Sequence, residues 1–220
     1  MDALLQLLVS HWVIIAALIG AVALAYCFLK WGQMSRARRI VGVFTVVLAL
    51  HMVEEYSIPG GFHYAFNVVQ GSADGNAYPL SALSAMVTNL AGMICFAALV
   101  FARAEKPWTL LLIAFFGIAQ AAVHTVFGVL AFNMFRDAGM ALPYSPGMAN
   151  SLVLMLPLSI ACIVALKRDR SLDAKQVAIA VLAAAFLIIG LIRIPIAFLG
   201  SDPQTAFRFA DAGFYQQFLL

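Results

Sequence analysis

Charged side chains are scarce in this chain of 220 residues: Asp, Glu, Lys and Arg make up 10% of it, whereas hydrophobic residues make up 64%. With a mean hydropathy of +0.98, this composition excludes an ordinary soluble domain. The net charge of +3 reports membrane topology, and we expect no nucleic-acid partner. The sequence therefore predicts an integral membrane protein of the all-α class.

Cysteine and intramembrane lysine are also nearly absent. Cys27, Cys95 and Cys162 each fall inside an apolar run and none forms a CxxC pair, which excludes a disulfide framework and a thiolate metal site. No lysine lies in the middle of an apolar run, so a retinal Schiff base has no candidate residue. The short connections leave no room for a separate soluble module.

What the sequence has instead is a series of apolar runs. A membrane span needs about 20 mostly apolar residues, and six runs qualify. We therefore expect residues 1–220 to form a single transmembrane domain, a compact bundle of about six helices at 9–30, 38–57, 80–102, 108–135, 149–166 and 176–199.

The basic residues predict the orientation of this bundle. Most of them fall into alternate connections, which the positive-inside rule assigns to the cytoplasm: Lys30, Arg36, Arg38, Arg39, Arg103, Lys106, Lys167, Arg168, Arg170 and Lys175. Both termini are then outside. We expect a bacterial inner (plasma) membrane protein whose polar site opens toward the extracytoplasmic side.

The C-terminal tail, 203–220, shows aromatic residues at helical spacing. Phe207, Ala210, Phe214 and Phe218 recur among polar residues, a pattern typical of an amphipathic helix that lies on the membrane surface. A short lipid-facing tail without a function explains the same pattern.

The run VGVFTVVLAL is followed by HMVEE, residues 51–55, which places a histidine and two glutamates in an apolar helix. Positions i, i+3 and i+4 share one face of a helix, so His51, Glu54 and Glu55 project toward one side. Ionised carboxylates in hydrocarbon are costly. Either water at the membrane interface or a partner inside the bundle must compensate them.

Other polar residues occur at a similar depth in the expected spans. From a rise of about 1.5 Å per residue, His51, Asn89, His124 and Arg193 lie roughly 9 to 16 Å below the outer ends of their spans. This common layer offers two partners for the glutamates. One is a bound cation held by His51, Glu54, Glu55 and His124; the other is an ion pair with Arg193.

Two imidazoles and two carboxylates suit a divalent metal, zinc or non-haem iron, better than calcium or magnesium. A histidine and a carboxylate at i and i+3 also resemble, in reverse order, the Glu-x-x-His pairs of di-iron helical bundles. His124 in AAVHTVFG has an ordinary alternative as a hydrogen-bonded core histidine. The roles of His11 and His63 stay open.

Three marks in order resemble the HXXEE family of integral membrane proteins, a family of unknown function. They are HMVEE, a second intramembrane histidine in AAVHTVFG, and YSPG at 144–147. The resemblance covers residues 40–165. It implies that these residues act as one set: His51, Glu54, Glu55, His124, Tyr144, Pro146 and Gly147.

The first functional hypothesis is a membrane-embedded metalloenzyme. His51, Glu54 and His124 would hold zinc in preference to iron, and Glu55 would act as the general base or a further ligand. Tyr144, Asn89 and Arg193 are further candidate catalytic residues, although Tyr144 is equally typical of a membrane interface. The substrate would be a lipid or another apolar small molecule, and the reaction a hydrolysis.

Three alternatives remain open. With iron, the same residues would suit di-iron-type oxidative lipid chemistry. Without metal, a buried glutamate and a histidine would suit an acid–base lipid isomerase or cyclase. Intramembrane carboxylates and histidines also mark proton or cation pathways, although the lack of an inverted repeat gives a transporter little support. The oligomeric state is not predicted.

Overall fold

A computed structural model describes residues 3–102, 106–169, 172–200 and 202–219. It is all-helical, with 79% of the residues in helices and no strand in the described ranges. The longer helical elements are α1 Ala3–Lys30, α2 Arg36–Tyr56, α3 Phe62–Val69, α4 Ala82–Phe101, α5 Pro107–Phe135, α7 Leu156–Asp169 and α8 Ala174–Ala185. The shorter ones are η1 Trp31–Gln33, η2 Arg136–Ala138, α6 Met148–Asn150, η3 Ser151–Met155, η4 Phe186–Arg193, α9 Ile194–Leu199 and η5 Gly213–Phe218.

Within the described ranges, five continuous helical stretches are long and apolar enough to cross a membrane: Ala3–Gln33, Ala82–Phe101, Pro107–Ala138, Met148–Asp169 and Ala174–Leu199. The chain is therefore an integral membrane protein. The sixth expected span, 38–57, corresponds to α2. Helix α2 differs from the other five because arginines precede its apolar stretch and two glutamates end it.

Local sequence signals explain where several helices begin. The side chain of Ser35 accepts a hydrogen bond from the backbone N–H of Arg38, and Ser81 caps α4 in the same way through Ser84. Pro107 occupies the first turn of α5, where a missing N–H costs nothing. These caps satisfy backbone donors that have no partner inside the helix.

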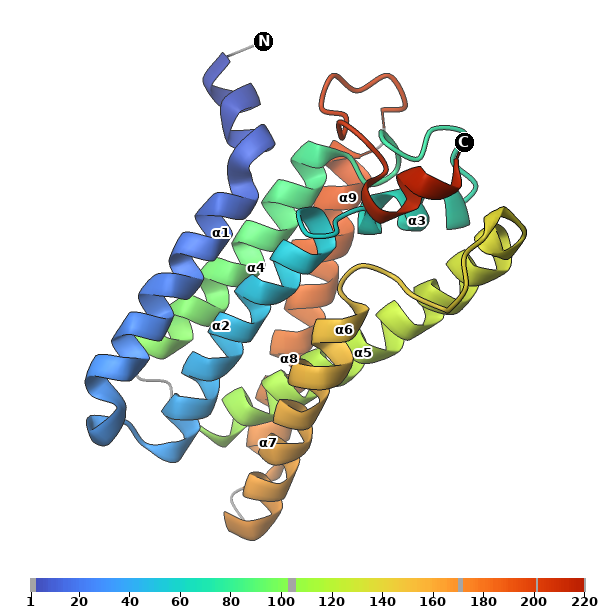
Figure 1. Cartoon of the computed structure of the whole chain (residues 1–220). Coiled ribbons are helices and arrows are strands. Elements are labelled where there is room, and N and C mark those ends of the chain that lie inside the picture. Colours follow the sequence, from blue (N-terminus) through green and yellow to red (C-terminus); the bar gives the residue numbers. More distant parts are fainter. Residues whose placement is uncertain (1–2, 103–105, 170–171, 201, 220) are drawn as a thin grey trace.

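Helix α2 lies inside the bundle, packed against α1, α4 and α5, as the ribbon shows (Figure 1). Its apolar face meets α4 and α5 through aromatic rings: the ring centroids of Phe44 and Phe96 are 5.0 Å apart, and those of Phe44 and Phe116 are 6.1 Å apart. This packing brings the last turn of α2 beside the middle of α5, where the polar residues lie.

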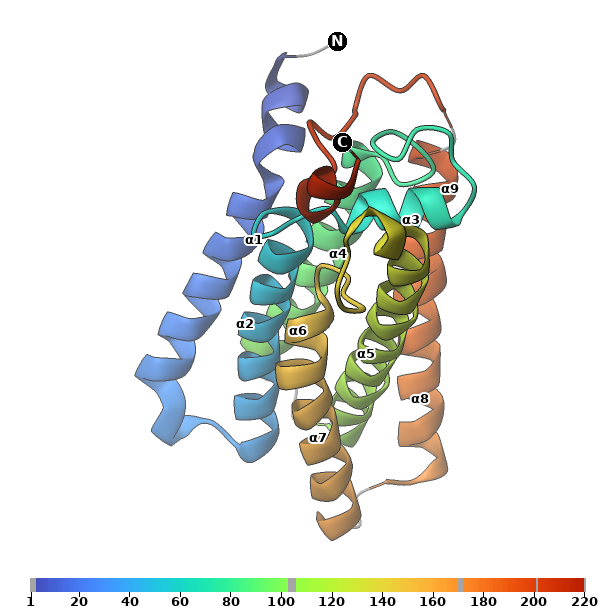
Figure 2. The same ribbon diagram turned by 45° about the vertical axis from the view of Figure 1, so that its right-hand side comes forward.

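One end of the bundle is covered by short elements. Helix α3, the connections around it and the C-terminal tail lie over this end, where α1 also begins (Figures 1 and 2). We call it the covered end. The basic helix ends with Lys30, Arg36, Lys106, Lys167 and Lys175 lie at the opposite end. Arg103 and Arg170, two of the predicted cytoplasmic residues, fall outside the described residues.

The tail is not the amphipathic helix that the aromatic spacing predicts. It contains only the 3-10 helix η5, and its backbone pairs with the loops of the covered end: Phe209 N–H donates to the Asn76 carbonyl, and Ala82 N–H donates to the Phe207 carbonyl. Tyr215 is fully buried against the ends of α3 and α5. The prediction was wrong because tertiary pairing and aromatic burial outweigh a local periodicity that has no long helix to continue it.

Candidate metal centre

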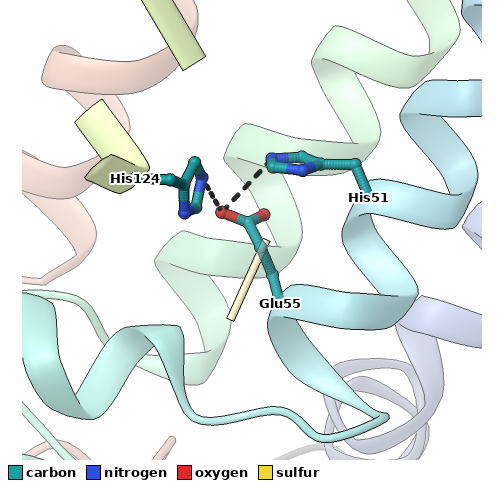
Figure 3. Close-up of side chains that lie close together, drawn as sticks. All are labelled: His51, Glu55 and His124. Carbon is teal, nitrogen blue, oxygen red and sulfur yellow. Dashed lines mark ion pairs between the residues drawn. The ribbon is translucent and has the colours of Figure 1, made fainter. Parts of the chain in front are cut away.

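Two histidines and one glutamate meet inside the bundle near its covered end. Glu55 Oε1 lies 3.1 Å from Nε2 of His124 and 3.5 Å from Nε2 of His51 (Figure 3). One ligand atom from each residue lies within 4.8 Å of the other two. The residues His51, Glu55 and His124 are 1%, 4% and 1% exposed. We call this arrangement the His–Glu–His group.

Helix geometry accounts for half of this arrangement. His51 and Glu55 are four residues apart on α2, so they lie one above the other on one face. His124 comes from α5, which packs against α2 at this level. The expected meeting of His51, Glu55 and His124 across two spans is therefore present in the structure.

Glu54, the fourth expected ligand, lies outside this group. Its carboxylate accepts hydrogen bonds from the Tyr144 hydroxyl at 3.0 Å and from the backbone N–H groups of Ala149 at 3.0 Å and Asn150 at 2.7 Å. These N–H groups begin the helical run Met148–Asp169, where backbone donors lack partners and a negative charge is favourable. Neighbouring residues on a helix point about 100° apart, so only one of the two glutamates faces the histidines.

Gly147 places the YSPG turn directly against the His–Glu–His group. Its backbone has φ +92°, which L side chains rarely adopt. A Cβ atom here would lie 2.5 Å from His124 Cε1, 2.8 Å from Glu55 Cγ and 2.8 Å from His51 Cε1. The turn therefore closes directly against all three side chains, and a residue larger than glycine does not fit.

Three neighbours that sequence reasoning missed complete the surroundings. The Gln120 Nε2 and Ser151 Oγ atoms each lie 3.4 Å from a ring nitrogen of His51, Nε2 and Nδ1 respectively. The Phe62 ring lies 4.7 Å from that of His124. A signal existed for Gln120, an amide one helical turn before His124 in an apolar run. No comparable signal marks Phe62, because only the fold of α3 brings it there.

One buried ring atom of the group has no partner. Nδ1 of His124 makes no hydrogen bond among the described residues, although the ring is almost fully buried. Buried polar atoms are normally paired with protein, water or an ion. Nδ1 of His124 is therefore a position where a further ligand can bind.

A cavity of about 410 Å³ opens beside the His–Glu–His group. Glu55 and His124 lie in its wall, together with Asn89 from α4 and Arg193 from η4. The Asn89 side chain donates to the Ala85 carbonyl. Most of the remaining wall is apolar, including Phe62, Phe66, Phe115, Phe116 and Phe127. Both the volume and the apolar lining are typical of a small-molecule site.

The other candidate residues lie away from this cavity. Tyr144 touches Glu54, and burial together with that carboxylate raises the pKa of its phenol, so that it stays a donor. His63 lies in the covering layer, where its ring stacks on Phe209 at 3.6 Å, and burial lowers its pKa. His11 is exposed on α1.

No ion pair joins Arg193 to either glutamate, both of which are described and otherwise partnered.

Residues 42–162 match the sequence profile of a family described as proteins of unknown function with an HXXEE motif. The chain belongs to the HXXEE family. Comparisons with curated proteins and with solved structures gave no match.

The structure separates the parts of the HXXEE motif. The histidine and the second glutamate, His51 and Glu55, meet His124, whereas the first glutamate, Glu54, holds the start of the helix that follows YSPG. The matched range contains this whole arrangement, whereas Arg193 lies beyond it. The HXXEE motif therefore combines a candidate ligand pair with a structural anchor.

Proposed function

We propose that this HXXEE protein is a membrane-embedded, metal-dependent enzyme that hydrolyses a lipid or another apolar small molecule. The observation that carries the proposal is the position of the His–Glu–His group, with Glu55 and His124 in the wall of an apolar cavity. Glu55 is a ligand in this proposal, and its second carboxylate oxygen is the base.

The two contacts of Glu55 with the histidines fit a small divalent ion. Zinc binds nitrogen and oxygen ligands at about 2.0 to 2.2 Å, which puts ligand atoms of a tetrahedral site roughly 3.3 to 3.6 Å apart. The two contacts of Glu55 Oε1, at 3.1 and 3.5 Å, are close to that separation. A metal cation also removes the cost of a carboxylate in a buried site.

His51, Glu55 and His124 would hold a zinc ion, which would supply hydroxide near neutral pH by lowering the pKa of a bound water to about 7. Residues of the chain would accept the proton and hold the substrate. Glu55 contacts both rings through Oε1, which leaves its second oxygen outside those contacts as the proton acceptor. The aromatic wall would hold an apolar substrate and exclude bulk water.

A second candidate is iron-dependent oxidation. With Glu54 engaged at a helix start, the remaining set is two histidines and one carboxylate. This set also binds non-haem iron in oxygenases. Metal identity decides between the two candidates.

The topology forms part of the proposal. We infer that α2 is a sixth span, that both termini face the extracytoplasmic side of a bacterial inner membrane, and that the site opens toward that side. The separation of the basic helix ends from the covered end supports this orientation. Single cysteines introduced at the exposed residues Phe28 and Leu142 should label from opposite sides of intact cells, and labelling from one side would contradict it.

Elemental analysis of the purified full-length protein tests the function. Purification without chelator should give about one zinc per chain, and His51→Ala or His124→Ala should lose it. Arg36→Gln, at the opposite end, is the control. Iron in place of zinc would favour oxidation. Active protein without stoichiometric metal would overturn the metalloenzyme and leave an acid–base isomerase built on the His124–Glu55 contact.

A further inference from the structure

Arg193 lies in the cavity wall without an acidic partner. Among the described residues, no carboxylate forms an ion pair with it and no hydrogen bond joins it to another group. Glu54 is held by Tyr144 and two backbone N–H groups, Glu55 contacts the histidines, and Asp74 pairs with Arg208. An unpaired guanidinium at intramembrane depth is costly.

Arg38 shows how this chain satisfies an arginine that serves structure. It is buried, its Nε donates to the Val100 carbonyl, a second nitrogen donates to the Tyr26 hydroxyl, and its guanidinium lies 5.2 Å from the centre of the Tyr26 ring. Arg193 has none of these contacts. It is exposed, and it lines a space large enough for a ligand.

The backbone presents Arg193 at a distinctive point. It ends the π-helical stretch Phe186–Arg193, and Pro195 follows two residues later. Proline removes a backbone donor, and membrane helices accommodate it through local π adjustments. Such π stretches often occur at functional sites. The second one in the described chain, Ser151–Met155, begins with the serine that touches His51.

Arg193 also lines two neighbouring hollows. Together with Gln70 and Ile196 it lines both the 410 Å³ cavity and a second hollow of about 390 Å³. The second hollow is bounded by Pro79, Phe198 and Gly200 near the covered end. A molecule that occupies both hollows would pass the guanidinium.

We propose that Arg193 binds the anionic head group, a carboxylate or a phosphate, of an amphiphilic substrate whose apolar chain lies in the cavity beside Glu55 and His124. The inference rests on the proposed function in one respect, which is that the cavity binds an apolar substrate. A guanidinium recognises both kinds of anion through paired N–H donors. The aromatic wall suits the chain.

Binding of three compounds with the same chain tests this: oleate, oleyl phosphate and oleyl alcohol, titrated against purified full-length protein in an uncharged detergent by displacement of a fluorescent fatty acid. The wild type should bind the anions more tightly than the alcohol. Arg193→Gln should weaken binding of the anions by roughly tenfold or more and leave the alcohol within about twofold. Arg193→Lys should recover part of the loss, and Arg36→Gln, remote from the cavity, should lose nothing.

The anion that binds more tightly, the carboxylate or the phosphate, identifies the head group. Equal losses for the alcohol and the anions, or no loss for any of the three, would overturn the inference. Metal content measured on the same preparations separates the two proposals. A metal-free wild type that still shows the Arg193-dependent preference contradicts only the metalloenzyme, whereas a metal-loaded protein without that preference contradicts only the head-group site.

Discussion

The two walls of the central cavity are built differently. We call the side formed by Glu55 and His124 the motif wall, and the side formed by Ala184, Ile188, Ile192, Arg193 and Ile196 the C-terminal wall. The stretch Pro107–Ala138, which carries His124, and the stretch Met148–Asp169 beside it are each 39% buried, whereas the C-terminal stretch Ala174–Leu199 is 11% buried. Only the motif wall falls inside the range matched by the family.

This contrast suggests that the two walls have different roles. The motif wall is packed, its carboxylate contacts both imidazoles, and Gly147 closes directly against all three side chains. The C-terminal wall is loosely covered and carries one unpaired cation. Chemistry would then belong to the first wall, and the choice of ligand to the second.

The largest expected effect concerns the adjacent glutamates. Glu55→Gln should reduce bound metal by roughly tenfold or more, because an amide is a poorer ligand than a carboxylate. Even the mutation of a residue that only hydrogen-bonds to a metal ligand lowers metal affinity by about tenfold or more. Glu54→Gln should keep the metal. It should instead lower the stability of the protein by about 1 to 3 kcal/mol, since the amide can no longer accept all of the bonds from the helix start.

Elemental analysis and thermal unfolding of both variants in detergent measure these effects. The hypothesis from the sequence instead takes Glu54 as a ligand and Glu55 as the base or a further ligand. Metal loss from Glu54→Gln with full retention in Glu55→Gln would support that assignment and contradict the geometry in Figure 3.

The second effect should come from the YSPG turn. Gly147→Ala combines a strained backbone with contacts to all three site residues, a cost of roughly 2 to 4 kcal/mol. This corresponds to a fall in melting temperature on the order of 10 °C. Metal content should fall with it, because the Cβ atom displaces the rings.

Gly139→Ala is the matched control. Gly139 has φ +100°, but a Cβ atom added there would meet no other atom within 4 Å, so this variant carries the backbone strain without the contacts. Equal losses in the two variants would mean that strain alone explains Gly147 and that the turn does not shape the site.

These cases indicate what the sequence could predict. Apolar runs predict all six long helical stretches, since hydrophobic length is a property of the chain alone. The spacing in HMVEE predicts a shared face for His51 and both glutamates, but a difference of one residue rotates a side chain by about 100°. Which glutamate meets His124 depends on where the Met148–Asp169 helix begins, and that is set by packing. The tail was mispredicted for the same kind of reason, because loop partners far away in sequence decide its backbone.

A smaller effect is expected at the hydroxyl that supports Glu54. Tyr144→Phe removes one of the hydrogen bonds to that carboxylate, and hydrogen bonds to charged groups contribute about 1.5 to 3 kcal/mol. Two backbone donors remain, so the melting temperature should fall by a few degrees and the metal should stay. Tyr215→Phe, which removes a bond to the neutral Tyr144 carbonyl, should cost less. A larger loss for Tyr215→Phe would show that the tail, rather than the carboxylate, fixes the turn.

The smallest effect should separate the C-terminal wall from the motif wall. Ala184 lies on α8 in the cavity wall, and Ala184→Phe would fill part of the 410 Å³ from the C-terminal wall. Because α8 is largely uncovered, it can shift slightly toward the lipid, and the cost in stability should stay below about 1.5 kcal/mol. Binding of oleate should weaken several-fold relative to the shorter decanoate, with metal content unchanged. Val181→Phe, on the same helix but 50% exposed and outside the cavity, should leave both affinities as they are. If Ala184→Phe removed the metal, the two walls would not be independent, and the division between chemistry and ligand choice would fail.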